Sequence, residues 1–140
     1  MKNLIRKILK ENDWDWATQA SSTISGEELE DFIRNNDLTE IPDHIKHVGG
    51  NLNLYNTPIK SLGNLETFGG HLDLYGTQIK SLENLESVDG NLDLRNSQIK
   101  SLGNLESVGG YLDLSNTTIS KKYSEQEIRN MVNVGGNIYL

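Results

Sequence analysis

The chain has 140 residues, which suggests a single domain, and its net charge of −7 at pH 7 makes it acidic. It contains no cysteine, which excludes disulfides, thiolate metal sites and a cysteine nucleophile and suits a reducing cytoplasm. Only 35% of its residues are hydrophobic, so a deep rounded core is hard to build, and no run of about 18 apolar residues could cross a membrane.

Residues 1–22 differ from the remainder, residues 23–140. The first ten residues carry +4 without an acid, which leaves −11 on residues 11–140. The pattern predicts a short amphipathic helix followed by the sequence DWDW, and the apolar side chains are Leu4, Ile5, Ile8, Leu9, Trp14 and Trp16. The longest apolar run in the first ten residues has two members, so we expect no export by a signal peptide. Three roles stay open: an extra cap, an anchor on a partner protein, or contact with a membrane surface.

A helix is predicted over residues 25–37. Ser25 and Glu28 fit a capping box, and Leu29, Phe32 and Ile33 form an apolar stripe at helical spacing. An irregular apolar stretch follows up to residue 48. We expect this helix to cover one end of the structure formed by the rest of the chain.

Three consecutive segments of 20 residues repeat one another, over residues 49–68, 69–88 and 89–108. The first reads GGNLNLYNTPIKSLGNLETF and shares 13 of 20 positions with the second, which shares 14 of 20 with the third. A fourth segment starts at Gly109 as GGYLDLSNTTIS, and a fragment, GGNIYL, starts at Gly135. Such fixed steps predict stacked coils with a thin continuous core between neighbours.

Each repeat contains two hydrophobic patterns. Leu52 and Leu54 alternate with polar residues, as in a short strand with one buried face. Apolar residues then recur every three positions, at Ile59, Leu62 and Leu65, which favours 3₁₀ turns or an extended chain over an α-helix. We therefore expect one strand and one return path in each coil, parallel stacking of the strands, and positive φ at the glycine pairs before them.

This pattern resembles the leucine-rich repeat, LxxLxLxxNxL, in its short bacterial class. The resemblance covers about residues 38–140 and implies a solenoid of the α/β class with mostly short parallel strands. Two positions depart from the family pattern. Glycine or aspartate replaces the first leucine at Gly49, Gly69, Asp89 and Gly109, and a hydroxyl replaces the asparagine at Thr57, Thr77, Ser97 and Thr117. A hydroxyl can make part of the backbone hydrogen bonds of asparagine, and without convex helices we expect a nearly straight stack.

The last coil is longer than the others, with 26 residues from Gly109 to Gly135. Ser124 and Glu127 form a capping box, and apolar residues follow at Ile128, Met131 and Val132. One helix is therefore expected to replace the return path of this coil. A final strand over residues 137–140 is expected to leave an unpaired edge.

The outward strand positions form three columns at the repeat spacing. They are Asn53, Asp73, Asp93, Asp113 and Tyr139; Asn51, His71, Asn91, Tyr111 and Asn137; and Tyr55, Tyr75, Arg95 and Ser115. The resemblance implies that partners bind on this strand face. The candidate contacts are Asp73, Asp93 and Asp113 for basic side chains, with Tyr55, Tyr75, Arg95, His71 and Tyr111 around them. Simple duplication of one repeat is an open alternative explanation of the aspartates.

Other polar side chains give no sign of chemistry. Basic and acidic ladders follow the return path, at Lys60, Lys80 and Lys100 and at Glu66, Glu86 and Glu106, and are expected to be solvated. The histidines His44, His47 and His71 lack neighbouring metal ligands, and no catalytic motif occurs. We therefore expect no metal, no cofactor and no enzymatic activity, and the acidic body disfavours nucleic acid.

The sequence thus predicts a non-catalytic protein-interaction module whose strand face binds a basic or mixed-charge protein. The start MKNLIRKILKENDWDW and the ending VGGNIYL resemble small proteins of marine bacteriophages, which implies a phage protein acting on a host protein in the host cytoplasm. Two alternatives remain open: a virion component anchored by residues 1–22, and a glycan-binding module.

Overall fold

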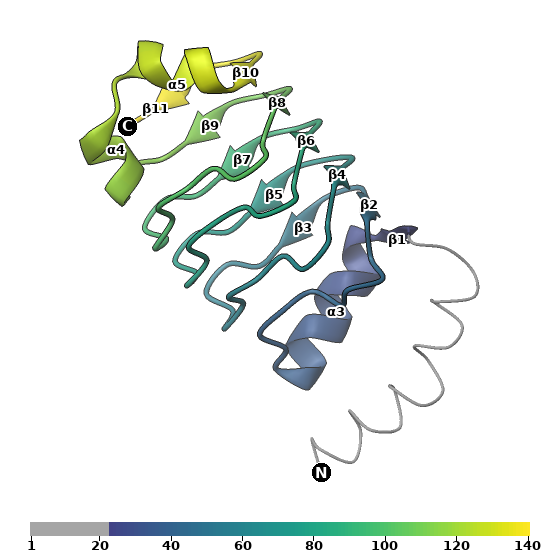
Figure 1. Cartoon of the computed structure of the whole chain (residues 1–140). Helices are drawn as coiled ribbons and strands as arrows, with labels where there is room; N and C mark the ends of the chain where they lie inside the picture. Colours follow the sequence, from purple (N-terminus) through teal and green to yellow (C-terminus); the bar gives the residue numbers. More distant parts are fainter. Residues whose placement is uncertain (1–22) are drawn as a thin grey trace.

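The structure is a computed structural model, and it describes residues 23–140. In this part the chain forms two parallel sheets of short strands with three helices (Figure 1). Residues 1–22 lie outside the described part, so the predicted helix and its possible roles stay predictions. This applies to Leu4, Ile5, Ile8, Leu9, Trp14 and Trp16.

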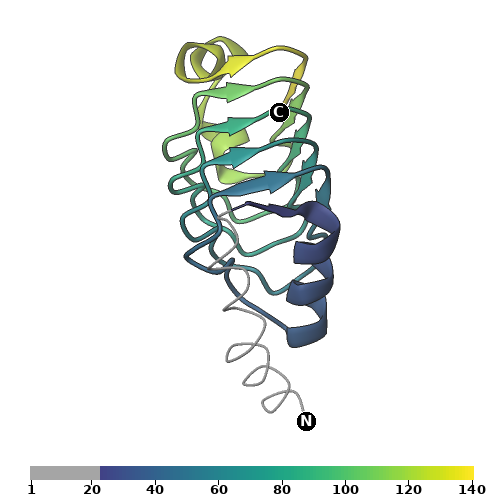
Figure 2. The same cartoon turned by 90° about the vertical axis from the view of Figure 1, so that its right-hand side faces the viewer.

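The chain passes through a six-stranded and a five-stranded sheet in turn. The six-stranded sheet has the order β1 (Thr23–Ser25), β2 (His47–Gly49), β4 (Thr67–Phe68), β6 (Ser87–Val88), β8 (Ser107–Val108) and β10 (Asn133–Val134). The five-stranded sheet has the order β3 (Leu52–Asn53), β5 (Leu72–Asp73), β7 (Leu92–Asp93), β9 (Leu112–Asp113) and β11 (Ile138–Tyr139). All neighbouring strands are parallel, and Figure 2 shows the successive coils lying one above another.

The strand register follows the 20-residue step of the sequence. Leu52 pairs with Leu72, Leu72 with Leu92, and Leu92 with Leu112. These leucines are at most 1% exposed, so the predicted interior row is confirmed. Ile138 continues the row after the longer last coil by pairing with Leu112.

The prediction of one strand per coil is wrong, because each 20-residue coil contains two. The second strand ends the return path, where a polar residue precedes a buried one, as in Ser87–Val88. Its backbone is paired with its neighbours, for example by Gly69 N–H donating to Val48 O at 2.7 Å. Only one apolar residue of this strand precedes the glycine pair, so no alternation marks it in the sequence.

The return path itself is extended, and residues 23–140 contain no 3₁₀ helix. Single turns interrupt it, in which the N–H of Leu65, Leu85 and Leu105 donates to the carbonyl three residues earlier at 3.0–3.2 Å. The return path thus combines non-helical chain with single turns that have the hydrogen bond of a 3₁₀ turn, but it contains no 3₁₀ helix. The apolar residues at three-residue spacing, such as Ile79, Leu82, Leu85 and Val88, all point into the core.

A buried hydroxyl row closes the core beside the five-stranded sheet. Thr57, Thr77, Ser97 and Thr117 are at most 6% exposed. Each hydroxyl donates to the backbone carbonyl three residues earlier at 2.6–2.8 Å, as predicted for a partial substitute of asparagine.

Helix α3 (Gly26–Asn36) covers the free edge of β3. Ser25 caps the helix by accepting from Glu28 N–H at 3.2 Å, and Leu29 and Ile33 enter the core. Glu30 accepts from Asn53 N–H at 3.1 Å, and Arg34 donates to Asn53 O at 2.9 Å. The predicted cap is confirmed, because these side chains supply the hydrogen bonds that a preceding strand would make.

The last return path contains two helices, not the single one predicted. Helix α5 (Glu125–Met131) begins at the predicted Ser124–Glu127 capping box. The additional helix α4 (Thr118–Lys122) begins at Thr117, whose hydroxyl also accepts from Ser120 N–H. Thr117 belongs to the buried hydroxyl row, so its second role as a helix cap is not visible from the repeat alone.

The glycine pairs do not adopt the predicted positive φ, except at Gly50 (φ 79°). Positive φ occurs instead at the corner after β3, β5, β7 and β9, at Asn56, Gly76, Asn96 and Asn116, and in the return path at Gly63, Glu83 and Gly103. After the first pair, glycine is needed for a different reason, which is close approach to the preceding coil. A Cβ on Gly70 would lie 2.5 Å from Gly50 O.

Candidate functional site

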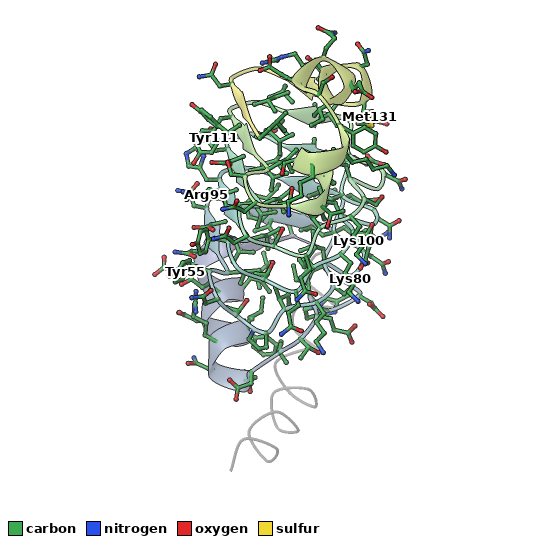
Figure 3. All side chains as sticks on the ribbon, turned by 90° about the vertical axis from the view of Figure 1, so that its left-hand side faces the viewer. Tyr55, Lys80, Arg95, Lys100, Tyr111 and Met131 are labelled. Carbon is green, nitrogen blue, oxygen red and sulfur yellow. The ribbon has the colours of Figure 1, made fainter. Side chains whose placement is uncertain are left out.

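The outward face of the five-stranded sheet brings the predicted site residues together. The register places Asp73, Asp93 and Asp113 side by side in β5, β7 and β9. Figure 3 shows Tyr55, Arg95 and Tyr111 on this side of the molecule. We call this surface, formed by the outward residues of β3, β5, β7, β9 and β11 and the positions flanking them, the strand face.

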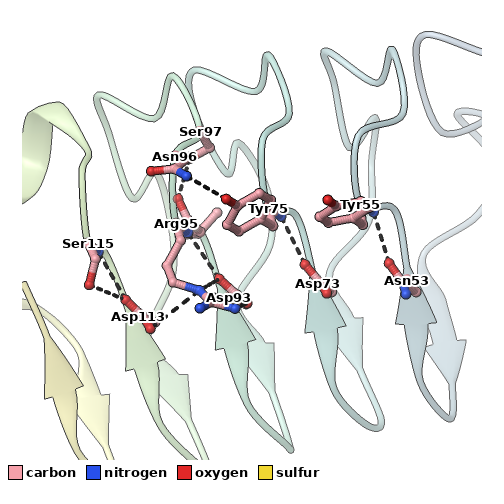
Figure 4. A network of polar contacts seen from close by, with 11 residues as sticks. Asn53, Tyr55, Asp73, Tyr75, Asp93, Arg95, Asn96, Ser97, Asp113 and Ser115 are labelled. Carbon is pink, nitrogen blue, oxygen red and sulfur yellow. Dashed lines mark hydrogen bonds and ion pairs between the residues drawn. The ribbon is translucent and has the colours of Figure 1, made fainter.

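Each aspartate of the strand face is hydrogen-bonded to the backbone of its own coil (Figure 4). The Oδ1 atom accepts from the N–H two residues later, at 2.9 Å in Asp73, 3.1 Å in Asp93 and 3.0 Å in Asp113. Asn53 makes the same bond at 2.9 Å. Because asparagine serves equally well, the position requires a side-chain acceptor and not a charge.

The prediction that all three aspartates are exposed is wrong, because Asp93 is only 6% exposed and Asp73 and Asp113 are partly buried. Arg95 binds Asp93 with two nitrogens, Nε at 3.0 Å from Oδ1 and Nη2 at 2.7 Å from Oδ2, and its Nε lies 3.6 Å from Asp113. The hydrogen bond with Asp93 and then its charge raise the pKa of Arg95 above its ordinary value. Arg95 thus offsets the repulsion between two neighbouring carboxylates.

The aromatic column is a stack. The rings of Tyr55 and Tyr75 lie 5.1 Å apart at an angle of 24°, and the Arg95 guanidinium lies 5.2 Å from the centroid of Tyr75. Asn96 donates to the Tyr75 hydroxyl at 2.7 Å. Figure 4 shows Tyr75 between Tyr55 and Arg95, so both faces of its ring are covered, and its hydroxyl points toward Asn96.

A second aromatic pair lies toward the other end of the strand face. Tyr111 and Tyr139 are in edge-to-face contact at 5.9 Å, and burial, followed by the charge of Asp93, raises the pKa of Tyr111 above 10. Tyr139 is 44% exposed and belongs to the surface, although it is absent from the predicted contacts. Tyr139 pairs with Asp113, which lies 26 residues earlier, and this pairing places Tyr139 on the strand face.

Comparison with known proteins assigns no family. No protein-family model, curated protein or solved structure matches the chain. Within residues 23–140, no group of three or more histidine, aspartate or glutamate side chains is arranged to hold a metal ion. In the same part, no helix has the length and apolar character needed to span a bilayer. Any functional proposal therefore depends on the surface itself.

His71 belongs to a ladder that joins the beginnings of successive strands. His71 N–H donates to Asn51 Oδ1, Asn91 N–H donates to His71 Nδ1, and Tyr111 N–H donates to Asn91 Oδ1, each at 2.8 Å. The imidazole therefore replaces an asparagine as acceptor. Like the aspartates, His71 is a predicted contact residue whose side chain accepts a hydrogen bond from the backbone.

His44 makes stability depend on pH. Burial lowers its pKa below the ordinary value of 6.5, and the charge of Asp43 opposes this shift only in part. Below pH 6.5, His44 is therefore protonated more readily in the unfolded chain than in the folded protein. The free energy of unfolding should fall as the pH is lowered from 7.5 to 5.5.

Urea unfolding of the wild type and His44→Gln over this pH range measures the effect. His47 and His71 are present in both proteins, so the difference between the two curves reports on His44. The prediction would be contradicted if the free energy of unfolding changed equally with pH in the wild type and in His44→Gln.

Proposed function

We propose that the protein is a non-catalytic protein-interaction module, a leucine-rich-repeat-type solenoid that binds one partner protein through its strand face. The 20-residue register of both sheets and the buried hydroxyl row support the repeat assignment. The phage resemblance of the chain favours a host protein as the partner.

The concentration of tyrosine on the strand face carries the proposal. Four of the five tyrosines of the chain, Tyr55, Tyr75, Tyr111 and Tyr139, lie on it. Tyrosine is enriched in protein interfaces because it combines a large apolar ring with a hydroxyl and loses little side-chain entropy. Tyr55 and Tyr139 are 46% and 44% exposed, so ring area remains for a partner to bury.

The stacked geometry favours a protein over a glycan. Sugar binding uses the open face of an aromatic ring, whereas Tyr75 is enclosed between Tyr55 and Arg95. The charges favour a basic or mixed-charge protein, since the strands carry Asp73, Asp93 and Asp113, and Arg95 pairs with only the last two. The virion alternative depends on residues 1–22 and gains no support from the described part.

The double variant Tyr55→Ser/Tyr139→Ser tests the strand face. The wild type should capture a partner protein from a bacterial lysate, and the variant should fail to capture it. The affinity of the variant for the purified partner should be at least about tenfold lower, because both exposed rings are removed. Capture with mass spectrometry identifies the protein, and titration measures the affinity.

The matched control is Lys60→Ser/Lys80→Ser on the return side, which should leave capture unchanged. A second variant, Asp73→Asn/Asp113→Asn, keeps the backbone acceptors and removes only charge, so it should reduce the salt dependence of binding. Equal capture by the tyrosine variant and the wild type would contradict the proposal.

A further inference from the structure

A groove of about 330 Å³ lies between the return path of residues 100–105 and the two helices α4 and α5. Its apolar wall consists of Leu102, Leu105, Ile119, Tyr123, Met131 and Val132. Figure 3 shows Lys100 and Met131 on the opposite side of the molecule from Tyr55 and Arg95. The groove is therefore separate from the strand face.

The groove exists because the stacking of return paths stops at this coil. Earlier in the stack, return paths pair with each other: Ser81 forms a parallel bridge with Ser101, and Leu82 N–H donates to Ser101 O at 3.3 Å. The next return path is replaced by α4 and α5. Within residues 23–140, Leu102 N–H and Lys100 O have no hydrogen-bond partner, as is also the case for Leu62 N–H and Lys60 O earlier in the stack.

The core is also less covered here than in the preceding coils. Leu102 is 9% exposed and Leu105 is 4% exposed, whereas the equivalent leucines Leu82 and Leu85 are fully buried. Met131 at the groove is 46% exposed. An unpaired extended backbone beside partly open apolar positions is the combination that binds an added strand.

The charge at the groove is opposite to that of the whole chain. Lys100 lines the groove, and no aspartate or glutamate does. Lys122 Nζ lies 5.3 Å from the ring of Tyr123, which also lines it. Neither lysine forms an ion pair within the described residues, in a chain with a net charge of −7.

We propose that this groove binds an extended segment of a partner protein that carries apolar side chains at three-residue spacing with acidic side chains between them. The segment would lie along residues 100–102, between this return path and helices α4 and α5. Its apolar side chains would cover Leu102 and Met131, its backbone would pair with residues 100–102, and its carboxylates would meet Lys100 and Lys122.

A fluorescein-labelled peptide with the sequence of residues 77–87, in which glutamate replaces Lys80, is a suitable probe, since it reproduces a return path of the stack. Fluorescence anisotropy with the full chain should show saturable binding, with a dissociation constant on the order of 100 µM for so small an interface. The same peptide with the natural lysine should bind about threefold more weakly at low salt.

Met131→Asp should weaken binding of the probe at least about tenfold, and Lys100→Glu about threefold. Leu140→Asp is the control, because Leu140 is 44% exposed but does not line the groove. Circular dichroism checks that all three variants are folded.

Four results would overturn the proposal. They are the absence of saturable binding, equal binding by the wild type and Met131→Asp, a dimer of the full chain that Met131→Asp dissociates in sedimentation equilibrium, and displacement of the probe by a synthetic peptide of residues 1–22. The last two would identify a second copy or the N-terminal segment of this chain as the occupant.

Discussion

Replacing Phe68 by alanine is expected to lower the free energy of unfolding by about 3–5 kcal/mol. Among residues 23–140, Phe68 is the largest fully buried side chain, at 1% exposure, and its strand β4 is paired with β2 and β6 on both sides. These parallel neighbours hold the backbone in register, so the structure cannot collapse into the cavity that the ring leaves. Urea unfolding followed by circular dichroism measures the loss.

The control for this prediction is Tyr55→Ala, which removes a ring of similar size at a position that is 46% exposed. It should cost only about 1 kcal/mol, mainly through the lost stack on Tyr75. Phe68→Val should fall between the two, because valine occupies the same column at Val48 and Val88 but is smaller than the space around Phe68. Similar losses for Phe68→Ala and Tyr55→Ala would show that the stack relaxes around cavities.

The interior of the molecule could be predicted because it repeats. A leucine at every twentieth position has only one way to stay buried in stacked parallel strands, which is to lie on the equivalent leucine of the next coil. The pairing of Leu52, Leu72 and Leu92 follows from this restriction. The end caps were also predictable, since Ser25 and Ser124 carry local capping signals that do not depend on tertiary contacts.

Features that depend on the next coil could not be predicted in the same way. The pairing of Ser87–Val88 with neighbouring strands is invisible in a two-residue pattern, and α4 begins at a threonine that looks like any other member of the hydroxyl row. Each arises from contacts between segments about 20 residues apart, which local periodicity does not report.

The candidate site was predicted in position but not in detail. The columns of the strand face lie where the register requires, and Tyr55, Tyr75 and Arg95 are neighbours in space. The bond from Asp93 to the N–H of its own coil, and the enclosure of that carboxylate by Arg95, depend on side-chain geometry. A row of aspartates in a repeat therefore indicates a backbone acceptor before it indicates a binding charge.

Replacing Gly90 by alanine is the second change with a large expected effect, a loss of at least about 2 kcal/mol in the free energy of unfolding. A Cβ at this position would lie 2.5 Å from His71 Nδ1 and 2.8 Å from Gly70 O. Neither neighbour can move freely, because Gly90 N–H donates to Gly70 O at 3.0 Å and Asn91 N–H donates to His71 Nδ1 at 2.8 Å. Urea unfolding again measures the change.

The glycine pairs provide a matched control for this explanation. A Cβ on Gly49 would meet no heavy atom within 4 Å, and the φ of Gly49 lies outside the left-handed region, so Gly49→Ala should change stability by less than about 0.5 kcal/mol. The double variant Gly90→Ala/His71→Ala should recover part of the loss, since it removes the ring but leaves the contact with the backbone of Gly70. If Gly49→Ala and Gly90→Ala were equally destabilising, close approach to the preceding coil could not be the reason that position 90 is glycine.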